Sequence, residues 1–407
     1  MAVAWVQRRV VAALLVLVAV QVFAGGGGGG RGGVSAFRLW PKKRTRKDTE
    51  GAGNDDTQQL LMGGADYMDG QIIPSSAVAA VNAYASSSVS ARECFSGKLP
   101  SGMYYFGAAV YNSELIIGGG FTPTEKLSFS DDDSPMLSMN AVNHTFKWTG
   151  SSWKVWNQFN VTKGEAHLAV LNGELYSLGS CGRQTRMCLE KYNSSKANEG
   201  WHLTKNQLPS VLSFPGVIAD EKDSSLFVVG GVQNKHTTRV VAQYSASTDK
   251  WFALPPMNIA RKSPAVAILG NRLCAVGGVQ STLQYSSRTL YMALRSAECM
   301  FLSAPSAGWS LLPLLPEARG SATAFVASNK LYVAGGVHVP LHWLSNRKED
   351  DDLQATVLEV ERRPYVSKLD SLDTASSWTN ASDSSRLFIS SSTLVTVPTK
   401  LYSQLCT

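Results

Sequence analysis

Few side chains in this sequence fall into a pattern that is typical of an enzyme active site. It contains no G-x-S-x-G nucleophile motif, no phosphate-binding Walker loop and no H-E-x-x-H metal motif. His338 and His342 have the spacing of two metal ligands on a helix, but Pro340 between them opposes a helix. The sequence therefore predicts no metal site, no cofactor and no catalytic residues.

Three charged residues are better candidates for contact with a ligand. Arg261, Arg319 and Glu165 each stand just before an apolar segment. A guanidinium group can donate a forked pair of hydrogen bonds to a carboxylate. It can equally satisfy backbone carbonyl groups of neighbouring structure, and the sequence leaves both roles open. The choice depends on the elements that carry these residues.

Those elements form a repeat. An apolar run, a short turn, a leucine, further apolar residues and two small residues recur along the chain. Turn dipeptides such as Asn172-Gly173 and Gly270-Asn271 predict that each copy is a β-hairpin. With 35 Gly, 16 Pro and 10 Trp, the composition also favours an all-β protein. The leucines that mark the copies are Leu115, Leu175, Leu226, Leu273, Leu331 and Leu401.

A second strand pair follows each hairpin and ends in a tryptophan, so each unit has four strands. Trp251 is the clearest example, with counterparts at Trp153, Trp201, Trp309 and Trp378. The paired glycines, Tyr192 and Tyr244 in the third strand, and the tryptophan followed by Leu-Pro resemble the Kelch repeat. The resemblance covers roughly residues 75–407 and implies that each unit is one blade of a β-propeller.

The last hairpin has no strand pair behind it, and the missing pair stands at the front of the chain. Residues 77–84 and 91–100 parallel the second half of a unit. We therefore expect six blades, the last built from two N-terminal and two C-terminal strands, which removes the open sheet edges. Seven blades is the alternative, if residues 353–390 contain another unit.

The first 74 residues are expected to lie outside the propeller. Residues 1–24, with Arg8 and Arg9 before an apolar run, are typical of a secretory signal peptide. Residues 25–74 are Gly-rich and then basic, which predicts a disordered linker. Residues 1–50 hold nine bases and two acids, so they carry the whole net charge of +7 and the body is neutral. A neutral body argues against nucleic acid as a partner.

The predicted compartment is therefore the secretory lumen or the extracellular space. The alternative is a membrane protein anchored by a retained signal segment, and membrane contact is expected only in that case. Four N-x-[ST] sequons fit the secretory route. They begin at Asn143, Asn160, Asn193 and Asn380.

Six cysteines in an oxidising compartment predict disulfides. Cys181 and Cys188 bracket a short loop, and Cys274 and Cys299 fall at the same end of one blade. Cys94 and Cys406 are expected at opposite ends of the sixth blade, beyond the ~7 Å that a disulfide allows between Cα atoms.

In a propeller of this kind, connections between strands 2 and 3 share a face with connections between blades. Arg261 and Arg319 are therefore expected at the mouth of the central channel, with Glu165 in the matching place of another blade. The resemblance implies that arginines at such a mouth contact acidic or peptide ligands. Asn143, Asn160 and Asn380 map to the same face.

These observations favour a recognition module for a protein, peptide or glycan that binds through this face. The alternative is a sugar mutarotase or epimerase of the six-bladed Kelch type. That activity would need Glu165 as a base with an arginine beside it.

Overall fold

The computed structural model describes residues 57–406 except 69–70, 84–88, 124–127, 130–134, 137–138, 182–186, 196–198, 235, 286–287, 339–360, 363–365, 374–376 and 382–390. The predicted signal peptide, the basic cluster and His342 lie outside the described residues. Among the described residues, no helix has the length and apolarity needed to cross a membrane.

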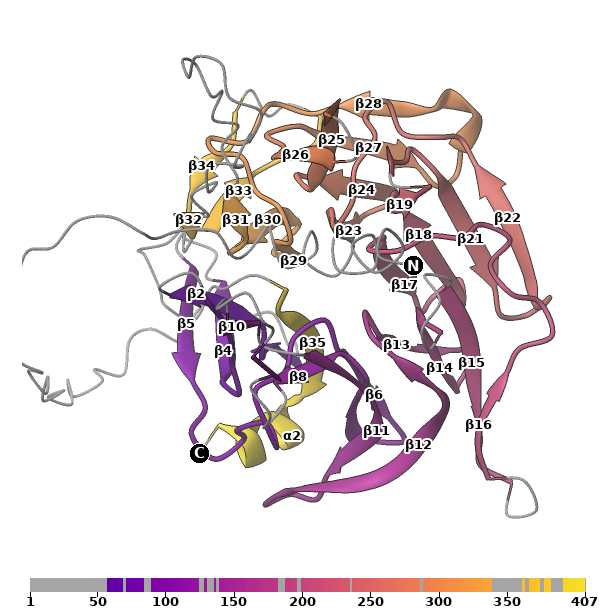
Figure 1. Cartoon of the computed structure of the whole chain (residues 1–407), viewed down its shortest axis with the longest axis vertical. Helices are drawn as coiled ribbons and strands as arrows, with labels where there is room; N and C mark the ends of the chain where they lie inside the picture. Colours follow the sequence, from indigo (N-terminus) through magenta and orange to yellow (C-terminus); the bar gives the residue numbers. More distant parts are fainter. Residues whose placement is uncertain are drawn as a thin grey trace, which may run out of the picture.

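Six antiparallel sheets are arranged in a ring (Figure 1), and their first strands line a central channel. Each sheet contains four strands in meander order, and blade 1 has an additional short strand. The prediction of six blades is confirmed. We number the strands of each blade 1 to 4 from the channel outward.

The first three complete blades follow one another along the chain. Blade 1 consists of β6 (Gly107–Tyr111), β7 (Glu114–Gly118), β11 (Met139–Trp148) and β12 (Trp153–Lys163). Blade 2 consists of β13 (His167–Leu171), β14 (Glu174–Ser180), β15 (Met187–Asn193) and β16 (Gly200–Leu203). Blade 3 consists of β17 (Gly216–Asp220), β18 (Ser225–Val229), β21 (Val241–Ser245) and β22 (Lys250–Leu254).

Two further blades continue this order. Blade 4 consists of β23 (Ala265–Leu269), β24 (Arg272–Val276), β27 (Ala297–Phe301) and β28 (Trp309–Leu311), with the 3-10 helix η1 (Pro305–Ala307) before β28. Blade 5 consists of β29 (Thr323–Ala327), β30 (Lys330–Ala334), β33 (Val366–Leu369) and β34 (Thr379–Asn380). Because β33 and β34 complete blade 5, the described part of the 353–390 stretch does not form the seventh blade of the alternative.

Blade 6 closes the ring with three N-terminal strands and one C-terminal strand. Its order is β35 (Thr393–Pro398), β1 (Thr57–Met62), β4 (Val78–Ala83) and β5 (Val89–Glu93). In Figure 1 the yellow β35 lies among the indigo strands. The predicted partition of two plus two strands is therefore wrong, and so is the linker boundary at residue 74, because β1 begins at Thr57.

The physical reason lies at both ends of the chain. Thr57–Met62 buries Leu60, Leu61 and Met62 and takes the position of strand 2. The residues expected to form that strand, around Leu401, instead form helix α2 (Thr399–Leu405). Leu401 and Leu405 of α2 pack into the core between blades 6 and 1.

Three disulfides join all six cysteines. Cys181 pairs with Cys188 and Cys274 with Cys299, as expected from their positions. Cys94 also pairs with Cys406, with 4.1 Å between their Cα atoms, so the expectation that they lie too far apart is wrong. Helix α2 crosses from the end of the innermost strand β35 toward the end of the outermost strand β5, and this carries Cys406 to Cys94.

Candidate functional site

Arg261 and Arg319 are buried inside the blades. Arg261 has no solvent exposure, and its Nη1 donates to the carbonyl oxygens of Gly277 and Ser296 at 2.7 and 3.0 Å. Its Nη2 lies 2.6 Å from Oε1 of Glu298, which is also fully buried. Arg319 is 1% exposed and donates to the carbonyl oxygen of Gly335 at 2.9 Å.

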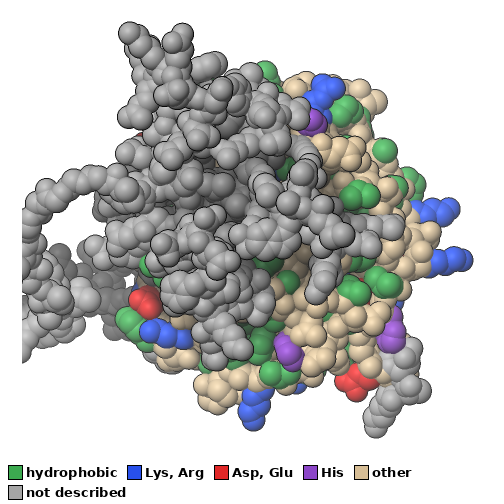
Figure 2. All heavy atoms as spheres, in the orientation of Figure 1, with side chains coloured by type: hydrophobic (Ala, Val, Ile, Leu, Met, Phe, Trp, Pro, Cys, Tyr) green, Lys and Arg blue, Asp and Glu red, His purple; other side chains and the backbone are tan. Residues whose placement is uncertain are grey.

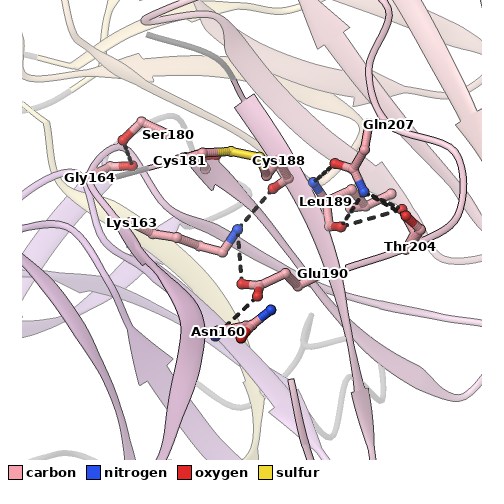
Figure 3. Close-up of polar contacts among 11 residues, drawn as sticks. Asn160, Lys163, Gly164, Ser180, Cys181, Cys188, Leu189, Glu190, Thr204 and Gln207 are labelled. Atoms are coloured by element: carbon pink, nitrogen blue, oxygen red, sulfur yellow. Dashed lines mark hydrogen bonds and ion pairs between the residues drawn. A yellow bond between two sulfur atoms is a disulfide. The ribbon is translucent and has the colours of Figure 1, made fainter. Parts of the chain in front are cut away.

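Lys163 makes the same kind of contact in blade 2 (Figure 3). Its Nζ donates to the carbonyl oxygen of Cys188 at 2.9 Å and lies 3.2 Å from Oε2 of Glu190. Both side chains of this ion pair are fully buried. Desolvation lowers the pKa of Lys163, and the charge of Glu190 opposes that change.

The backbone of these three residues joins each blade to the one before it. Their carbonyl oxygens each accept a hydrogen bond from a glycine N–H. The pairs are Gly120 to Lys163 at 2.9 Å, Gly231 to Arg261 at 2.8 Å and Gly278 to Arg319 at 2.7 Å. These glycines belong to the repeated pairs. Gly231 and Gly278 have positive φ of 110° and 93°, which explains why the repeat carries glycine there. Each basic residue therefore bonds one blade with its backbone and the next with its side chain.

The predicted binding role of Arg261 and Arg319 is corrected by these contacts. A guanidinium that is fully buried and hydrogen-bonded to carbonyl groups does not face the channel, so the carbonyl-satisfying role left open above is the one it fills. The expectation that Glu165 occupies the place of these arginines in blade 2 is also wrong. Lys163, not Glu165, stands four residues before its first strand, as Arg261 and Arg319 do. That offset is a sequence signal that could have identified Lys163.

Glu165 belongs to a different set, a ring of six residues at the mouth of the channel. All six are non-glycine residues with positive φ, between 44° and 54°. Such a backbone costs roughly 1 kcal/mol per residue and persists only where the surroundings enforce it. The ring consists of Tyr105, Glu165, Phe214, Ser263, Ser321 and Ser391, one before the first strand of each blade.

Hydrogen bonds run around this ring from blade to blade. The N–H of Ser263 donates to the carbonyl oxygen of Phe214 at 2.7 Å, and that of Ser391 to Ser321 at 2.9 Å. Glu165 breaks the pattern, because its side-chain Oε2 accepts the N–H of Phe214 at 2.5 Å. Across the ring, the Tyr105 hydroxyl lies 2.9 Å from the Ser321 Oγ.

The channel next to the ring encloses a cavity of about 290 Å³. Glu165 and His167 both line it. Burial raises the pKa of Glu165 to about 8, against the opposing hydrogen bond from Phe214 and the charge of Lys262. Burial also lowers the pKa of Lys262 to about 8 and that of His167 to about 4. The channel mouth is therefore a cluster of perturbed titratable groups.

This cluster predicts a pH-dependent stability. Because the pKa of Glu165 is raised from 4.5 to about 8 on folding, its contribution to stability is lost as pH rises between about 5 and 8. Glu165→Gln keeps an oxygen for the Phe214 N–H and cannot ionise. Urea unfolding should show the variant gaining stability relative to wild type across this range, by about 2 to 4 kcal/mol.

His167 and Lys262 change the stability with pH in the opposite sense, because folding lowers their pKa values. The lowered pKa of His167 removes stability as pH falls below 6.5, and that of Lys262 adds stability as pH rises above about 8. Both groups remain in Glu165→Gln. Stability profiles of variant and wild type that run parallel from pH 5 to 8 would contradict the prediction.

Short hairpins surround the ring on the same face and form what we call the hairpin crown. They arise in the connections between strands 2 and 3 of five blades. Blade 6 contributes β2–β3 (Ala65–Met68, Gln71–Pro74). Blade 1 contributes β8 (Phe121–Pro123), which pairs with β11, and the hairpin β9–β10 (Ser128–Phe129, Pro135–Met136). Blades 3, 4 and 5 contribute β19–β20 (Val232–Gln233, His236–Thr237), β25–β26 (Val279–Tyr285, Arg288–Ala293) and β31–β32 (Val337–His338, Glu361–Arg362).

Hydrogen bonds join the crown to residues beside the ring and join neighbouring hairpins of the crown to each other. Residues next to the ring pair with the first residue of a hairpin strand, as in Lys262 with Val279 and Ser213 with Val232. Neighbouring hairpins meet where the Thr237 and Ser281 hydroxyl groups lie 2.9 Å apart. In blade 2, strand β14 ends at Ser180 and β15 begins at Met187, and the disulfide Cys181–Cys188 joins the residues beside these two strand ends.

The asparagines of the four sequons differ in their exposure to solvent. Asn160 on β12 and Asn380 on β34 are exposed, whereas Asn143 on β11 and Asn193 at the end of β15 are half-buried. On the face in Figure 2, hydrophobic side chains of the described residues are scattered rather than gathered into one patch.

Comparison with known proteins supports the repeat assignment, although no family model matches the chain. A Kelch repeat and BTB domain-containing protein 1 from Horsepox virus is 25% identical over 151 residues, covering 36% of this chain and 26% of that protein. Alpha-scruin from Limulus polyphemus is 23% identical over 277 residues, covering 65% of this chain and 28% of that protein. The matches thus span about a quarter of these relatives' length.

A solved structure shares the fold. YjhT matches with a TM-score of 0.53 and 12% identity, over 79% of this chain and 97% of that chain. Together with the repeats, these findings show a closed six-bladed β-propeller whose sequence is similar, at low identity, to proteins with Kelch repeats.

Proposed function

We propose that this propeller is a recognition module that binds a protein partner through the hairpin crown. A Kelch-repeat propeller is in general a protein-interaction module. The observation that carries the proposal is the difference between the two faces. One face has hairpins in the connections between strands 2 and 3 of five blades. On the other face, the described residues that connect strands 1 and 2 or strands 3 and 4 contain no such hairpin. Extended loops on a rigid scaffold are typical of binding surfaces.

We also propose that the chain works in an oxidising secretory compartment. Three disulfides fit such a compartment. The signal-like residues 1–24 and the exposed sequons at Asn160 and Asn380 support the same route.

The sugar mutarotase alternative has less support. It requires an arginine beside Glu165, but the side chains of Arg261 and Arg319 are bonded inside blades 4 and 5. The charged neighbour that acts on Glu165 is Lys262. We therefore favour recognition over this enzyme activity.

A pair of matched variants tests the crown. In blade 3, His236 of β20 and Arg239, two residues after β20, are exposed on the crown face, whereas Lys222 and Lys250 are exposed on the opposite face. His236→Ala with Arg239→Ala should weaken binding of a partner captured by the full chain about tenfold or more. Lys222→Ala with Lys250→Ala should leave that affinity unchanged. Affinities are compared by surface plasmon resonance with the purified partner.

The opposite result would overturn the proposal. Binding that survives the crown variant and fails in the opposite-face variant would place the interface elsewhere. Arg261 and Arg319 are unsuitable for this test, because alanine there would remove buried bonds between blades and report on folding.

A further inference from the structure

A second cavity, of about 620 Å³, lies between blades 2 and 3, away from the channel. Tyr176, Lys191 and His202 stand in register on β14, β15 and β16 and line its blade 2 wall. Tyr244 and Asp249 of blade 3 line the other side. We call this cavity the blade 2–3 cleft.

Hydrogen-bonding groups are held in place along the cleft. The Tyr244 hydroxyl donates to Oδ1 of Asp249 at 2.8 Å. Lys191 Nζ lies 3.3 Å from Oε1 of Glu174 and 5.9 Å from the centre of the Tyr176 ring. The Lys191 and Glu174 side chains are 42% and 41% exposed. An ion pair this exposed is weak, so either side chain can leave it to bind a ligand.

The cleft also offers apolar surface. Leu203, at the end of β16, is 47% exposed and lines the same cavity. Donors, acceptors and an exposed aliphatic side chain together suit a ligand with many hydroxyl and amide groups and an apolar ring face. N-acetylated sugars have this combination of groups.

One residue of the cleft can carry a carbohydrate itself. Asn193 lines the cavity and begins the sequon Asn193-Ser194-Ser195. Its Oδ1 accepts the N–H of Ser195 at 2.9 Å, so the orientation of the side-chain amide is set. A sugar on Nδ2 therefore starts at the cleft wall. Asn160 and Asn380 lie on outer strands β12 and β34 and do not line this cavity.

We propose that Asn193 carries an N-linked glycan whose first sugars lie in the blade 2–3 cleft. The glycan comes from a lipid diphosphate-linked oligosaccharide. A bond forms between Nδ2 and the anomeric carbon while the bond from that carbon to the diphosphate oxygen breaks, and Nδ2 loses one proton. This inference rests on the secretory route proposed above.

The test compares glycans on the full chain secreted from cultured eukaryotic cells. Mass spectrometry measures occupancy at Asn193 and Asn160, and native protein is then treated with peptide-N-glycosidase. Because the cleft shields the linkage, release at Asn193 should be about tenfold slower than at exposed Asn160. After denaturation the two rates should agree.

A wall variant gives the matched control. Leu203→Ala leaves the sequon intact and opens the cleft, so release at Asn193 should accelerate toward the rate at Asn160. Equal native rates in the wild type, or an unmodified Asn193 beside a modified Asn160, would overturn the inference and leave the secretory route standing. If none of the sequons is modified, the secretory route fails as well.

Discussion

Glu298→Ala is expected to lower the free energy of unfolding by about 3 to 5 kcal/mol. Glu298 is fully buried, and its Oε1 accepts from Arg261 at 2.6 Å. Its Oε2 accepts the N–H of Asn258 at 2.7 Å, and Oε1 also accepts that of Ile259 at 3.2 Å. Alanine would leave a buried guanidinium without its counter-ion and two backbone donors without their acceptors. Urea unfolding measures the loss.

The matched control is a glutamate in an exposed ion pair. Glu114 lies 3.1 Å from Lys147 and is 46% exposed, so Glu114→Ala should cost less than about 1 kcal/mol. Glu298→Gln keeps an acceptor without the charge, so its loss of free energy of unfolding should fall between those of Glu298→Ala and Glu114→Ala. This variant provides the measurement if Glu298→Ala does not fold. Similar losses for Glu298→Ala and Glu114→Ala would show that the buried pair does not hold blades 3 and 4 together.

Removal of the Cys94–Cys406 disulfide is expected to cost about 4 to 5 kcal/mol. Its cysteines are 312 positions apart, so the bond closes a loop of about three quarters of the 407-residue chain in the unfolded state. The double variant Cys94→Ser with Cys406→Ser also loses the covalent support of blade 6. Denaturant unfolding of the oxidised proteins provides the measurement.

The Cys181–Cys188 disulfide gives the comparison. It spans only 7 positions, and Cys181→Ser with Cys188→Ser should cost about half as much, roughly 2 to 3 kcal/mol. Equal losses, or a larger loss from the short bond, would contradict the argument from chain entropy.

The blades could be predicted from the sequence because each repeat carries its own local signals. Turn dipeptides such as Asn172-Gly173, the paired glycines and the closing tryptophans report local geometry that recurs in every copy. The closure of blade 6 has no such signal. Thr57–Met62 is a short segment in polar surroundings, and only its pairing with β35 and β4 makes it a strand.

The candidate site was harder to predict than the fold. Arg261 stands where the chain enters a blade, and sequence position alone does not say whether its side chain faces the channel or the blade. The ring residues have no common chemistry, since Tyr105, Glu165 and Ser263 occupy equivalent places. Their shared property is a positive φ imposed by hydrogen bonds from neighbouring blades, which is a tertiary effect.

The closure of blade 6 also sets when a newly made chain can finish folding. On the ribosome, β1 is synthesised among the first strands, and its partner β35 among the last. Until β35 emerges, one edge of β1 has unpaired backbone groups, which can pair with another nascent chain. Translation that stops before Thr393 leaves this edge open permanently. Such truncated products should aggregate, even though each of blades 1 to 5 is built from consecutive strands that end before Thr393.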